Sequence, residues 1–114
     1  MSKTQYEEPN GDSKKELRFN HPSGWLYLTQ HESVPVLIDA LLDLPPHREF
    51  NQKEFADHAG VTRQTVANYL PLLLEVEIIE EVSNTSPTRY QLADSAVVEE
   101  LFALNGALNN VAPR

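Results

Sequence analysis

The stretch FNQKEFADHAGVTRQTVANYLPLLL, residues 50–74, decides the fold of this chain. Asn51 is a favoured helix N-cap, and Glu54 follows three residues later, where its carboxylate can reach back to the amide of the cap. Phe50 and Phe55 stand at the two positions of a hydrophobic staple, which fixes the angle at which a chain enters a helix. These signals agree and predict a helix that begins directly after Asn51.

The same signals recur further along the stretch and predict a second helix. Gly60 can adopt the positive φ that a sharp reversal between helices requires. Thr62 is a good N-cap after the turn, and Val61 and Val66 form the matching staple. The local order is therefore helix, turn, helix.

The spacing of residue types also fits a helix-turn-helix. Ala56 is the small residue where the two helices approach, Gly60 is the turn glycine, and Val66 is the branched apolar residue beneath the second helix. The stretch resembles the helix-turn-helix of DNA-binding transcription regulators. The other residues expected on the buried side are Phe55, Ala59, Val61 and Tyr69 or Leu70.

The second helix is predicted to turn a polar face outward, because a period of 3.6 residues directs Val66 and Leu70 toward the core. A solvated helix face without a partner is the alternative interpretation of this face. The helix-turn-helix residues that we expect to contact DNA are Asn51, Gln52, Lys53, Thr62, Arg63, Gln64, Thr65, Ala67 and Asn68.

The chemistry of these side chains suits base edges and phosphates. Arg63 can bond to guanine with two donors, and Gln64 or Asn68 can bond to adenine. The hydroxyls of Thr62 and Thr65, with the amides of the helix N-terminus, suit phosphates.

Pro71 interrupts the pattern of the second helix. Proline inside a helix removes a hydrogen bond and clashes with the preceding turn, at about 3 kcal/mol. The residue before it, Leu70, is disfavoured in the α conformation. We therefore expect the helix either to kink or to restart at this point.

A β-hairpin is predicted after this helix, from strands over residues 78–82 and 88–92 around a turn-rich loop, 83–87. The order of elements over residues 34–92 resembles the winged helix-turn-helix domain, and LLLEVEIIEEVSNTSPTRYQL looks like the helix end and wing of MarR, ArsR and TrmB-like regulators. In those groups a glycine usually precedes the first wing strand, whereas this chain has Glu77.

The resemblance implies that the wing tip lies along the minor groove or the backbone of DNA. A plain solvent-exposed hairpin is the alternative. Acidic residues around the wing are expected to point away from DNA or to be neutralised by cations; they are Glu75, Glu77, Glu80 and Glu81. The expected wing contacts are Ser83, Asn84, Thr85, Ser86, Thr88 and Arg89.

The last segment, residues 93–112, has apolar residues at alternating spacings of four and three, which is the seam of a coiled coil. Many winged-helix regulators resemble this plan, with a terminal helix that forms a homodimer. Packing onto the first helix of the same chain is the alternative. The predicted dimerisation residues are Val97, Leu101, Leu104, Leu108 and Val111.

Three segments precede the helix-turn-helix. Residues 1–20 are polar and lack apolar periodicity, so we expect a disordered tail. Residues 21–32 contain the apolar cluster Trp25–Leu28, which is too short to assign by periodicity. A core helix is predicted from Ser33 to Leu44, where two prolines end it.

Composition limits the classes of protein that this chain can be. Its 114 residues, 40% of them hydrophobic, suit one domain with tails, and the absence of cysteine excludes disulfides, thiolate metal sites and cysteine nucleophiles. No apolar run approaches the roughly 20 residues of a membrane span, and the N-terminus lacks the apolar centre of a secretory signal. We expect a soluble cytoplasmic protein.

The net charge of −8, from 17 acidic and 9 basic residues, is opposite to that of an ordinary nucleic-acid binder. Acidic surfaces occur in proteins of very salty cytoplasms, where the screening length is near 3 Å at about 1 M salt. An origin in a halophilic, haloarchaeal proteome is therefore one hypothesis for this composition.

Catalytic and metal-binding patterns are weak. The four histidines show no pairing at the i+3 or i+4 spacing of metal ligands, and no glycine-rich phosphate loop is present. His58 is interpreted as a surface or phosphate-contacting residue. We expect no enzymatic activity, no metal and no cofactor.

The predicted fold class is α+β and mainly α: a winged helix-turn-helix over residues 33–92, with a two-stranded wing, followed by the terminal helix. The predicted function is sequence-specific binding of double-stranded DNA by a dimeric transcription regulator, with a recognition helix over about 62–74. A protein-interaction module that does not bind DNA is one alternative. A ligand-sensing regulator, with a pocket between residues 25–28, the first helix and the terminal helix, is another.

Overall fold

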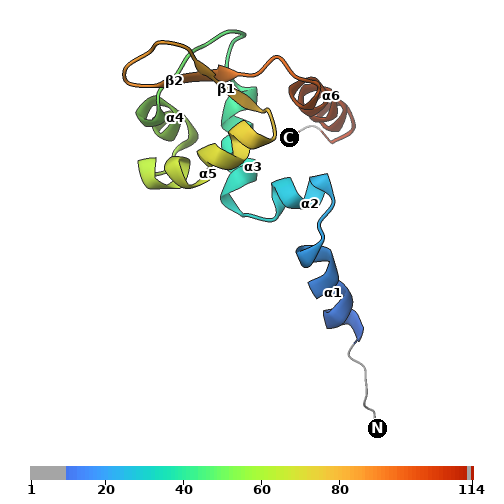
Figure 1. Ribbon diagram of the computed structural model, residues 1–114. Helices are drawn as coiled ribbons and strands as arrows, with labels where there is room; N and C mark the ends of the chain where they lie inside the picture. Colours follow the sequence, from blue (N-terminus) through green and yellow to red (C-terminus); the bar gives the residue numbers. More distant parts are fainter. Residues whose placement is uncertain (1–9, 113) are drawn as a thin grey trace. The chain divides into compact units, whose positions relative to one another are not determined.

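The computed structural model describes residues 10–112 and 114, and the chain divides into two compact units, Met1–Glu32 and Ser33–Arg114 (Figure 1). The first unit contains α1 (Asn10–Asn20) and α2 (Gly24–Thr29). The second contains α3 (Ser33–Leu42), α4 (Gln52–Ala59), α5 (Arg63–Glu75), β1 (Ile79–Val82), β2 (Arg89–Leu92) and α6 (Ala96–Val111). None of the helices in the described residues is long and apolar enough to cross a membrane.

The first unit corrects the prediction of a disordered tail. Residues 10–20 form α1, while residues 1–9 of the predicted tail lie outside the described residues. Side chains 13–20 are all exposed, so local propensity rather than packing accounts for this helix; Lys, Glu, Leu and Arg are good helix formers. The apolar cluster at 25–28 is also helical, because Ser23 caps α2 by accepting a hydrogen bond from the amide of Leu26, at 3.2 Å.

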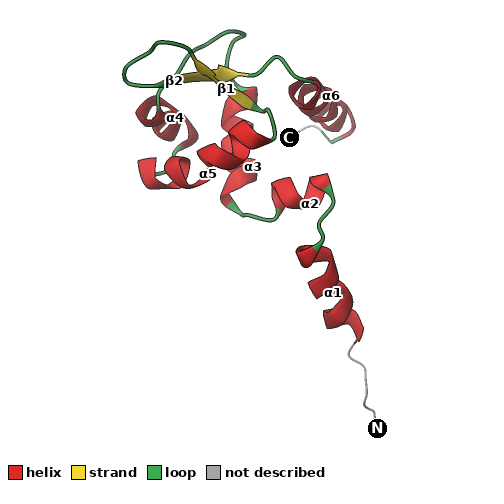
Figure 2. Cartoon of the chain, viewed as in Figure 1, coloured by secondary structure: helices red, strands yellow, loops and turns green. Residues whose placement is uncertain are grey.

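The second unit is built around a three-helix core that the wing completes. α3 buries one broad apolar face, as its periodicity predicts, and α4 and α5 pack against it. Figure 2 shows the two strands beside these helices, in the order that the sequence predicts. The largest fully buried side chains are Phe55, Leu37, Leu41, Leu73, Ile78, Ile79, Val34 and Val66.

The hairpin is antiparallel, with Ile79 opposite Leu92 and Val82 opposite Arg89. Each strand begins one residue later than predicted. The loop end of the hairpin is joined to the segment before α4, because the amides of Phe50 and Tyr90 each donate to the carbonyl of the other, at 2.9 and 2.7 Å. This bridge attaches the wing to the start of the helix-turn-helix.

α5 is continuous through Pro71, so of the two expected outcomes, a kink or a restart, the restart does not occur, and Leu70 remains helical. Leu70 and Leu73 are buried on either side of the proline, at 5% and 0% exposure. Burying one leucine contributes about 1.5–3 kcal/mol, so two of them offset a proline cost of about 3 kcal/mol. Tertiary packing therefore outweighs the local preference.

The end of α5 forms without the glycine that is usual at this place in the MarR, ArsR and TrmB-like regulators that the sequence resembles. Glu77 adopts a left-handed conformation, with φ of 63°. Its amide donates to Leu74 and the amide of Ile78 donates to Leu73, at 3.1 and 3.0 Å, which is the hydrogen-bond pattern of a Schellman motif. The turn that the sequence put in doubt is therefore made in the usual way, with Glu77 in the glycine position.

α6 forms where the sequence predicts a terminal helix, and Ser95 caps it by accepting from the amide of Val98, at 3.1 Å. The Ser95 hydroxyl also donates to the carbonyl of Glu77, at 2.6 Å, which connects α6 to the end of α5. No residue of α6 is buried within this chain. Val98, Leu101 and Asn105 are half-buried, so both the dimer and the alternative, packing onto the first helix of the same chain, stay predictions.

Candidate nucleic-acid interface

The start of α4 has the capping geometry that the sequence predicts. The amide of Asn51 donates to Glu54 Oε1 at 2.9 Å, and the amide of Glu54 donates to Asn51 Oδ1 at 2.8 Å. The rings of Phe50 and Phe55 lie 5.1 Å apart between centroids. Both the polar and the apolar parts of this helix start are confirmed, so α4 begins at a fixed place.

The turn between α4 and α5 sets the direction of the second helix. Gly60 has φ of 74°, and its amide and that of Val61 both donate to the carbonyl of Ala56. Thr62 caps α5 by accepting from the amide of Thr65, at 3.1 Å. Val66 is fully buried, so the opposite side of α5 faces away from the core.

The outward face of α5 presents polar but mostly uncharged groups. Arg63, Gln64 and Asn68 are exposed, and Ala67 is half-buried between them. The amide nitrogen of Gln64 donates to Asn68 Oδ1 at 2.8 Å, which leaves Gln64 Oε1 as an acceptor and the Asn68 amide nitrogen as a donor. Arg63 makes no hydrogen bond or ion pair with the rest of the described chain.

The two threonines at the start of α5 are already bonded to each other. Their hydroxyls lie 3.0 Å apart, and the Thr62 hydroxyl also serves as the cap. A phosphate at this helix start would therefore be bound by the exposed first-turn amides as much as by the hydroxyls.

The candidate residues of α4 are less available than the face of α5. Asn51 is used in the capping box, and Gln52 is half-buried. Lys53 forms an ion pair with Asp57 at 2.9 Å, with both side chains 67% exposed. An exposed pair of this kind is weak, so Lys53 can exchange Asp57 for a phosphate.

The wing tip divides into exposed and engaged residues. Asn84 has a left-handed backbone, with φ of 61°, and is exposed together with Ser83, Ser86 and Thr88. Thr85 is half-buried; its hydroxyl donates to the carbonyl of Val82 at 3.0 Å and accepts from the amide of Arg89 at 2.9 Å. The Thr85 hydroxyl, which was expected to contact phosphate, therefore closes the wing loop instead.

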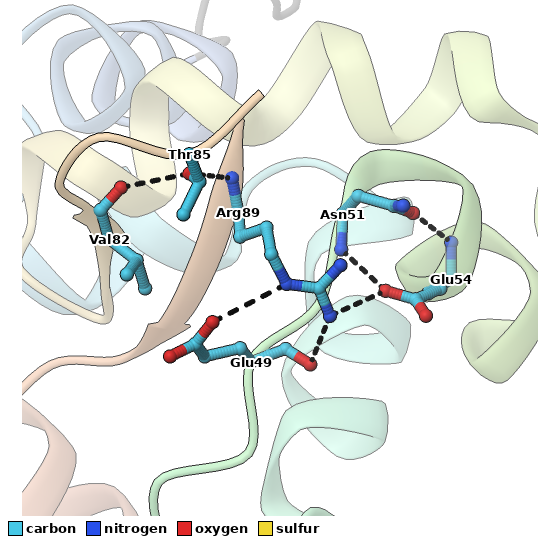
Figure 3. Close-up of polar contacts among 6 residues, drawn as sticks. All are labelled: Glu49, Asn51, Glu54, Val82, Thr85 and Arg89. Carbon is cyan, nitrogen blue, oxygen red and sulfur yellow. Dashed lines mark hydrogen bonds and ion pairs between the residues drawn. The ribbon is translucent and has the colours of Figure 1, made fainter. Parts of the chain in front are cut away.

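Arg89 reaches from β2 to the start of α4 (Figure 3). Its Nη2 donates to the carbonyl of Glu49 and to Glu54 Oε1, both at 3.1 Å, and its Nε lies 3.4 Å from Glu49 Oε1. The side chain is 31% exposed. No pattern in the sequence indicates these partners, which precede Arg89 by 40 and 35 positions.

The capping carboxylate of Glu54 is held in its charged form. The amide of Asn51, which donates to it, is the main cause that lowers the pKa of Glu54 below its ordinary value of 4.5, and the charge of Arg89 adds to this shift. One carboxylate thus caps α4 and holds the wing arginine.

His58 is part of the packing between α3 and α4. Its Nε2 lies 3.1 Å from the carbonyl of Ala40 and 3.5 Å from Asp43 Oδ2. His58 is exposed, as the surface interpretation predicts, but its ring is also engaged within the chain. The described residues contain no cluster of three or more histidine or acidic side chains that could hold a metal ion.

Two hollows are lined in part by residues of the hairpin. One, of about 620 Å³, is lined by Arg48, Phe55 and His58 together with the residues around Arg89. The other, of about 470 Å³, lies between the loop after α3, the hairpin and α6, and includes His47, Glu80 and Phe102.

The arrangement of the second unit decides its fold: a helix-turn-helix whose second helix has an outward polar face, followed by a hairpin and a terminal helix. The fold is the winged helix-turn-helix. Within this winged helix-turn-helix, the sequence correctly predicted the order of elements from α3 to α6.

Known structures share this fold over nearly their whole length. The chain is similar to the transcriptional repressor BigR from Xylella fastidiosa, with 23% identity, coverage of 94% of this chain and 99% of that one, and a TM-score of 0.58. It is also similar to NolR from Sinorhizobium fredii, with 17% identity, 96% and 97% coverage, and a TM-score of 0.56. Reduced HlyU from Vibrio cholerae matches with 15% identity, 92% and 96% coverage, and a TM-score of 0.53.

No protein-family model matches the sequence of this winged helix-turn-helix chain, and no curated protein matches it.

Proposed function

We propose that this protein is a transcription regulator that binds double-stranded DNA in a sequence-specific manner. The observation that carries the proposal is the outward polar face of α5, on a helix whose start is fixed by Gly60 and Thr62. In this proposal α5 enters the major groove, and the wing, residues 83–89, lies beside the backbone or the minor groove. The likeness to the repressor BigR supports the same class of function.

Base reading is assigned to three side chains of α5. The Gln64–Asn68 pair offers one acceptor and one donor, which complement the amino group and N7 of adenine. Arg63, which has no partner within the described chain, can give two donors to O6 and N7 of guanine. We therefore expect adenine and guanine to be selected at neighbouring positions of each half-site.

Backbone contacts are assigned to groups around these readers. They are the first-turn amides of α5 with Thr62 and Thr65, the α4 residues Gln52 and Lys53, and the exposed wing residues Asn84, Ser86 and Thr88. Asn51 acts indirectly, because its side chain holds the start of α4. Ala67 lies between Arg63 and Asn68, where it can contact a thymine methyl group.

Homodimer formation through α6 completes the proposal. Val97, Leu104, Leu108 and Val111 are 36%, 45%, 49% and 80% exposed in the single chain, which supports a seam that a second copy would cover. A two-fold dimer would present two recognition helices to half-sites about 34 Å apart, and so read a palindrome.

The test is selection of binding sites from a random duplex library, followed by binding measurements with Arg63→Met and with Gln64→Ala combined with Asn68→Ala. We expect the wild type to enrich a palindrome. Each variant should lose discrimination at its own base, by about 1–3 kcal/mol. If the wild type enriches no duplex sequence at any salt concentration, the regulator proposal fails.

One observation favours a second candidate, a winged-helix module that binds protein instead of DNA. Residues 33–114 hold twelve of the seventeen acidic residues but five of the nine basic ones. Such a unit repels phosphate and would favour a basic protein surface. Failure of duplex selection, with binding to a basic peptide library through the same α5 face, would support this candidate.

A ligand-sensing regulator is the other alternative predicted from the sequence. The sequence placed its pocket near residues 25–28, which do not line the hollow of about 470 Å³ beside α6; that hollow nevertheless has the size of a small-molecule site. An effector bound there would alter the operator affinity measured in the same assay.

A further inference from the structure

The loop end of the hairpin, where Tyr90 and Arg89 lie, is fastened to the start of α4 by two neighbouring sets of contacts. Phe50 and Tyr90 exchange backbone hydrogen bonds at 2.9 and 2.7 Å. Glu49 and Arg89 are the residues directly before Phe50 and Tyr90. The guanidinium of Arg89 bonds to Glu49 and also to Glu54 (Figure 3). The backbone bridge fixes where the hairpin meets α4, and the arginine fork lies across the same junction.

We propose that Arg89 is a positioning residue that holds the wing at a set angle to the helix-turn-helix and contacts no phosphate itself; this inference rests on the proposed DNA binding. The planar fork of arginine suits this task, because it can bond to a carbonyl and two carboxylates in fixed directions. A wing held in this way is preorganised before DNA arrives.

Two properties of the Arg89 environment argue against a phosphate contact. The side chain is 31% exposed, and its Nη2 and Nε face Glu49 and Glu54. With Arg48 also close to Glu54, the group contains two positive and two negative charges and offers no net attraction to phosphate. Turning the guanidinium toward DNA would leave both carboxylates near the phosphates.

The backbone of Arg89 has a related part in shaping the wing. Its amide donates to the Thr85 hydroxyl, which itself donates to the carbonyl of Val82. Val82 and Arg89 are the last paired residues of the two strands, so this hydroxyl closes the loop at the point where pairing ends. The side chain of Arg89 ties this end of the hairpin to α4, and its amide helps to fix the loop.

The first arm of the test is amide hydrogen exchange without DNA, in the full chain. In Arg89→Met the amides of Phe50 and Tyr90 should exchange faster by about two- to fivefold, as expected for loss of a weak ion pair. Arg89→Lys keeps the charge but not the fork, so it should not restore protection. Arg63→Met, the matched arginine change on α5, should leave both amides unchanged.

The second arm measures affinity for the selected duplex as a function of salt. Arg89→Met should lower affinity severalfold while the slope of log K against log salt stays at the wild-type value. Loss of a phosphate contact would instead reduce that slope by about 0.9 per subunit. The slope therefore distinguishes a positioning residue from a phosphate ligand.

Removing the charge of Glu54 has opposite expected effects on DNA affinity if Arg89 positions the wing and if Arg89 contacts phosphate. Glu54→Gln can keep the capping box, since glutamine suits that position, but it weakens the bond to Arg89. Positioning predicts faster exchange at Phe50 and Tyr90 and weaker DNA binding, although a negative charge has been removed. Asp57→Asn, the control on the same helix, should leave exchange at these amides unchanged and affinity equal or higher.

Unchanged exchange in Arg89→Met, or a slope reduced by about 0.9 per subunit, would overturn the inference. If the wild type selects no duplex, the proposed function fails separately. In that case the hydrogen-exchange measurement would still show whether Arg89 holds the wing, but the inferred contribution of Arg89 to DNA binding would be contradicted.

Discussion

Glu77 occupies a backbone position that favours glycine. Its φ of 63° lies in the left-handed region, which costs a residue with a Cβ atom roughly 1–2 kcal/mol. The conformation is kept because the amides of Glu77 and Ile78 bond to the end of α5 and the Glu77 carbonyl accepts from Ser95. The helix end and the start of α6 are thus held at the cost of a strained glutamate.

Glu77→Gly should therefore stabilise the protein. Relief of the left-handed cost, less the entropy that glycine adds to the unfolded chain, gives a gain of about 0.5–1 kcal/mol. Urea unfolding followed by circular dichroism measures the difference. Glu100→Gly, an exposed position inside α6, is the control and should cost about 1 kcal/mol. A destabilised Glu77→Gly variant would contradict the argument.

Glu54 makes stability depend on pH in the acid range. Its pKa in the folded state is lowered below 4.5, first by the bond from the Asn51 amide and then by Arg89, with Arg48 adding a smaller attraction. A lowered folded pKa contributes stability that is present above the unfolded value and lost as pH falls through the folded value. We expect this contribution to be complete at neutral pH and to decline below about pH 4.5.

The measurement compares the free energy of unfolding of wild type and Glu54→Gln between pH 7 and pH 3. The advantage of the wild type should shrink as pH falls, because the protonated carboxylate and the amide then offer similar bonds. Asp57→Asn again provides a control, since Asp57 accepts no capping hydrogen bond. An advantage that stays constant over this range would show that the carboxylate charge does not matter.

These residues also show what the sequence could and could not predict. The capping box of Asn51 and Glu54 and the staple of Phe50 and Phe55 join residues at most five positions apart, so local pattern was sufficient. The partners of Arg89 are 35 and 40 positions away, and no periodicity relates them. The sequence therefore assigned Arg89 to DNA and could not predict that its guanidinium bonds to Glu49 and Glu54.

Among the elements, α1 and α6 mark the two limits of pattern-based prediction. α6 was predicted because apolar residues repeat along one side and Ser95 can cap it. α1 was missed because its residues 13–20 bury nothing and their helical propensity alone is a weak signal. Burial patterns identify helices that pack, or that have a face to pack, and they overlook helices formed by local preference.

The exposed seam of α6 leads to a prediction about assembly. Leu104→Asp with Leu108→Asp should convert a dimer into a folded monomer, because both side chains are about half exposed in the single chain and support no core. Light scattering gives the mass and circular dichroism the fold. Asn109→Asp with Asn110→Asp adds the same charges to exposed positions off the seam and should leave the dimer intact.

Two results would contradict this assignment. One is a wild type that is monomeric at high micromolar concentration. The other is a double aspartate variant that keeps the dimer mass.

At the scale of the whole molecule, the charge distribution limits how DNA can be bound. Of the five cations in residues 33–114, Lys53 pairs with Asp57, and Arg89 bonds to Glu49 and Glu54. Arg114 bonds to Asn109 and to a nearby carbonyl. Arg48 and Arg63 remain, and Lys53 can exchange Asp57 for a phosphate. Because Arg63 is assigned to bases, a dimer would bring about four cations, two copies each of Arg48 and Lys53, to the phosphates. Specificity must then come mainly from neutral hydrogen bonds and shape.

The affinity of the selected duplex should therefore depend weakly on salt. Each phosphate neutralised contributes about −0.9 to the slope of log K against log salt, so two to four contacts give about −2 to −4, against about −5 to −9 for proteins with six to ten contacts. Titration by fluorescence anisotropy between 0.05 and roughly 1 M KCl measures it. Binding that persists near the upper limit would fit an acidic protein adapted to a salty cytoplasm. A slope steeper than about −5 would mean that further cations reach the DNA, and substitution of Lys14, Lys15 and Arg18 in α1 would then identify them.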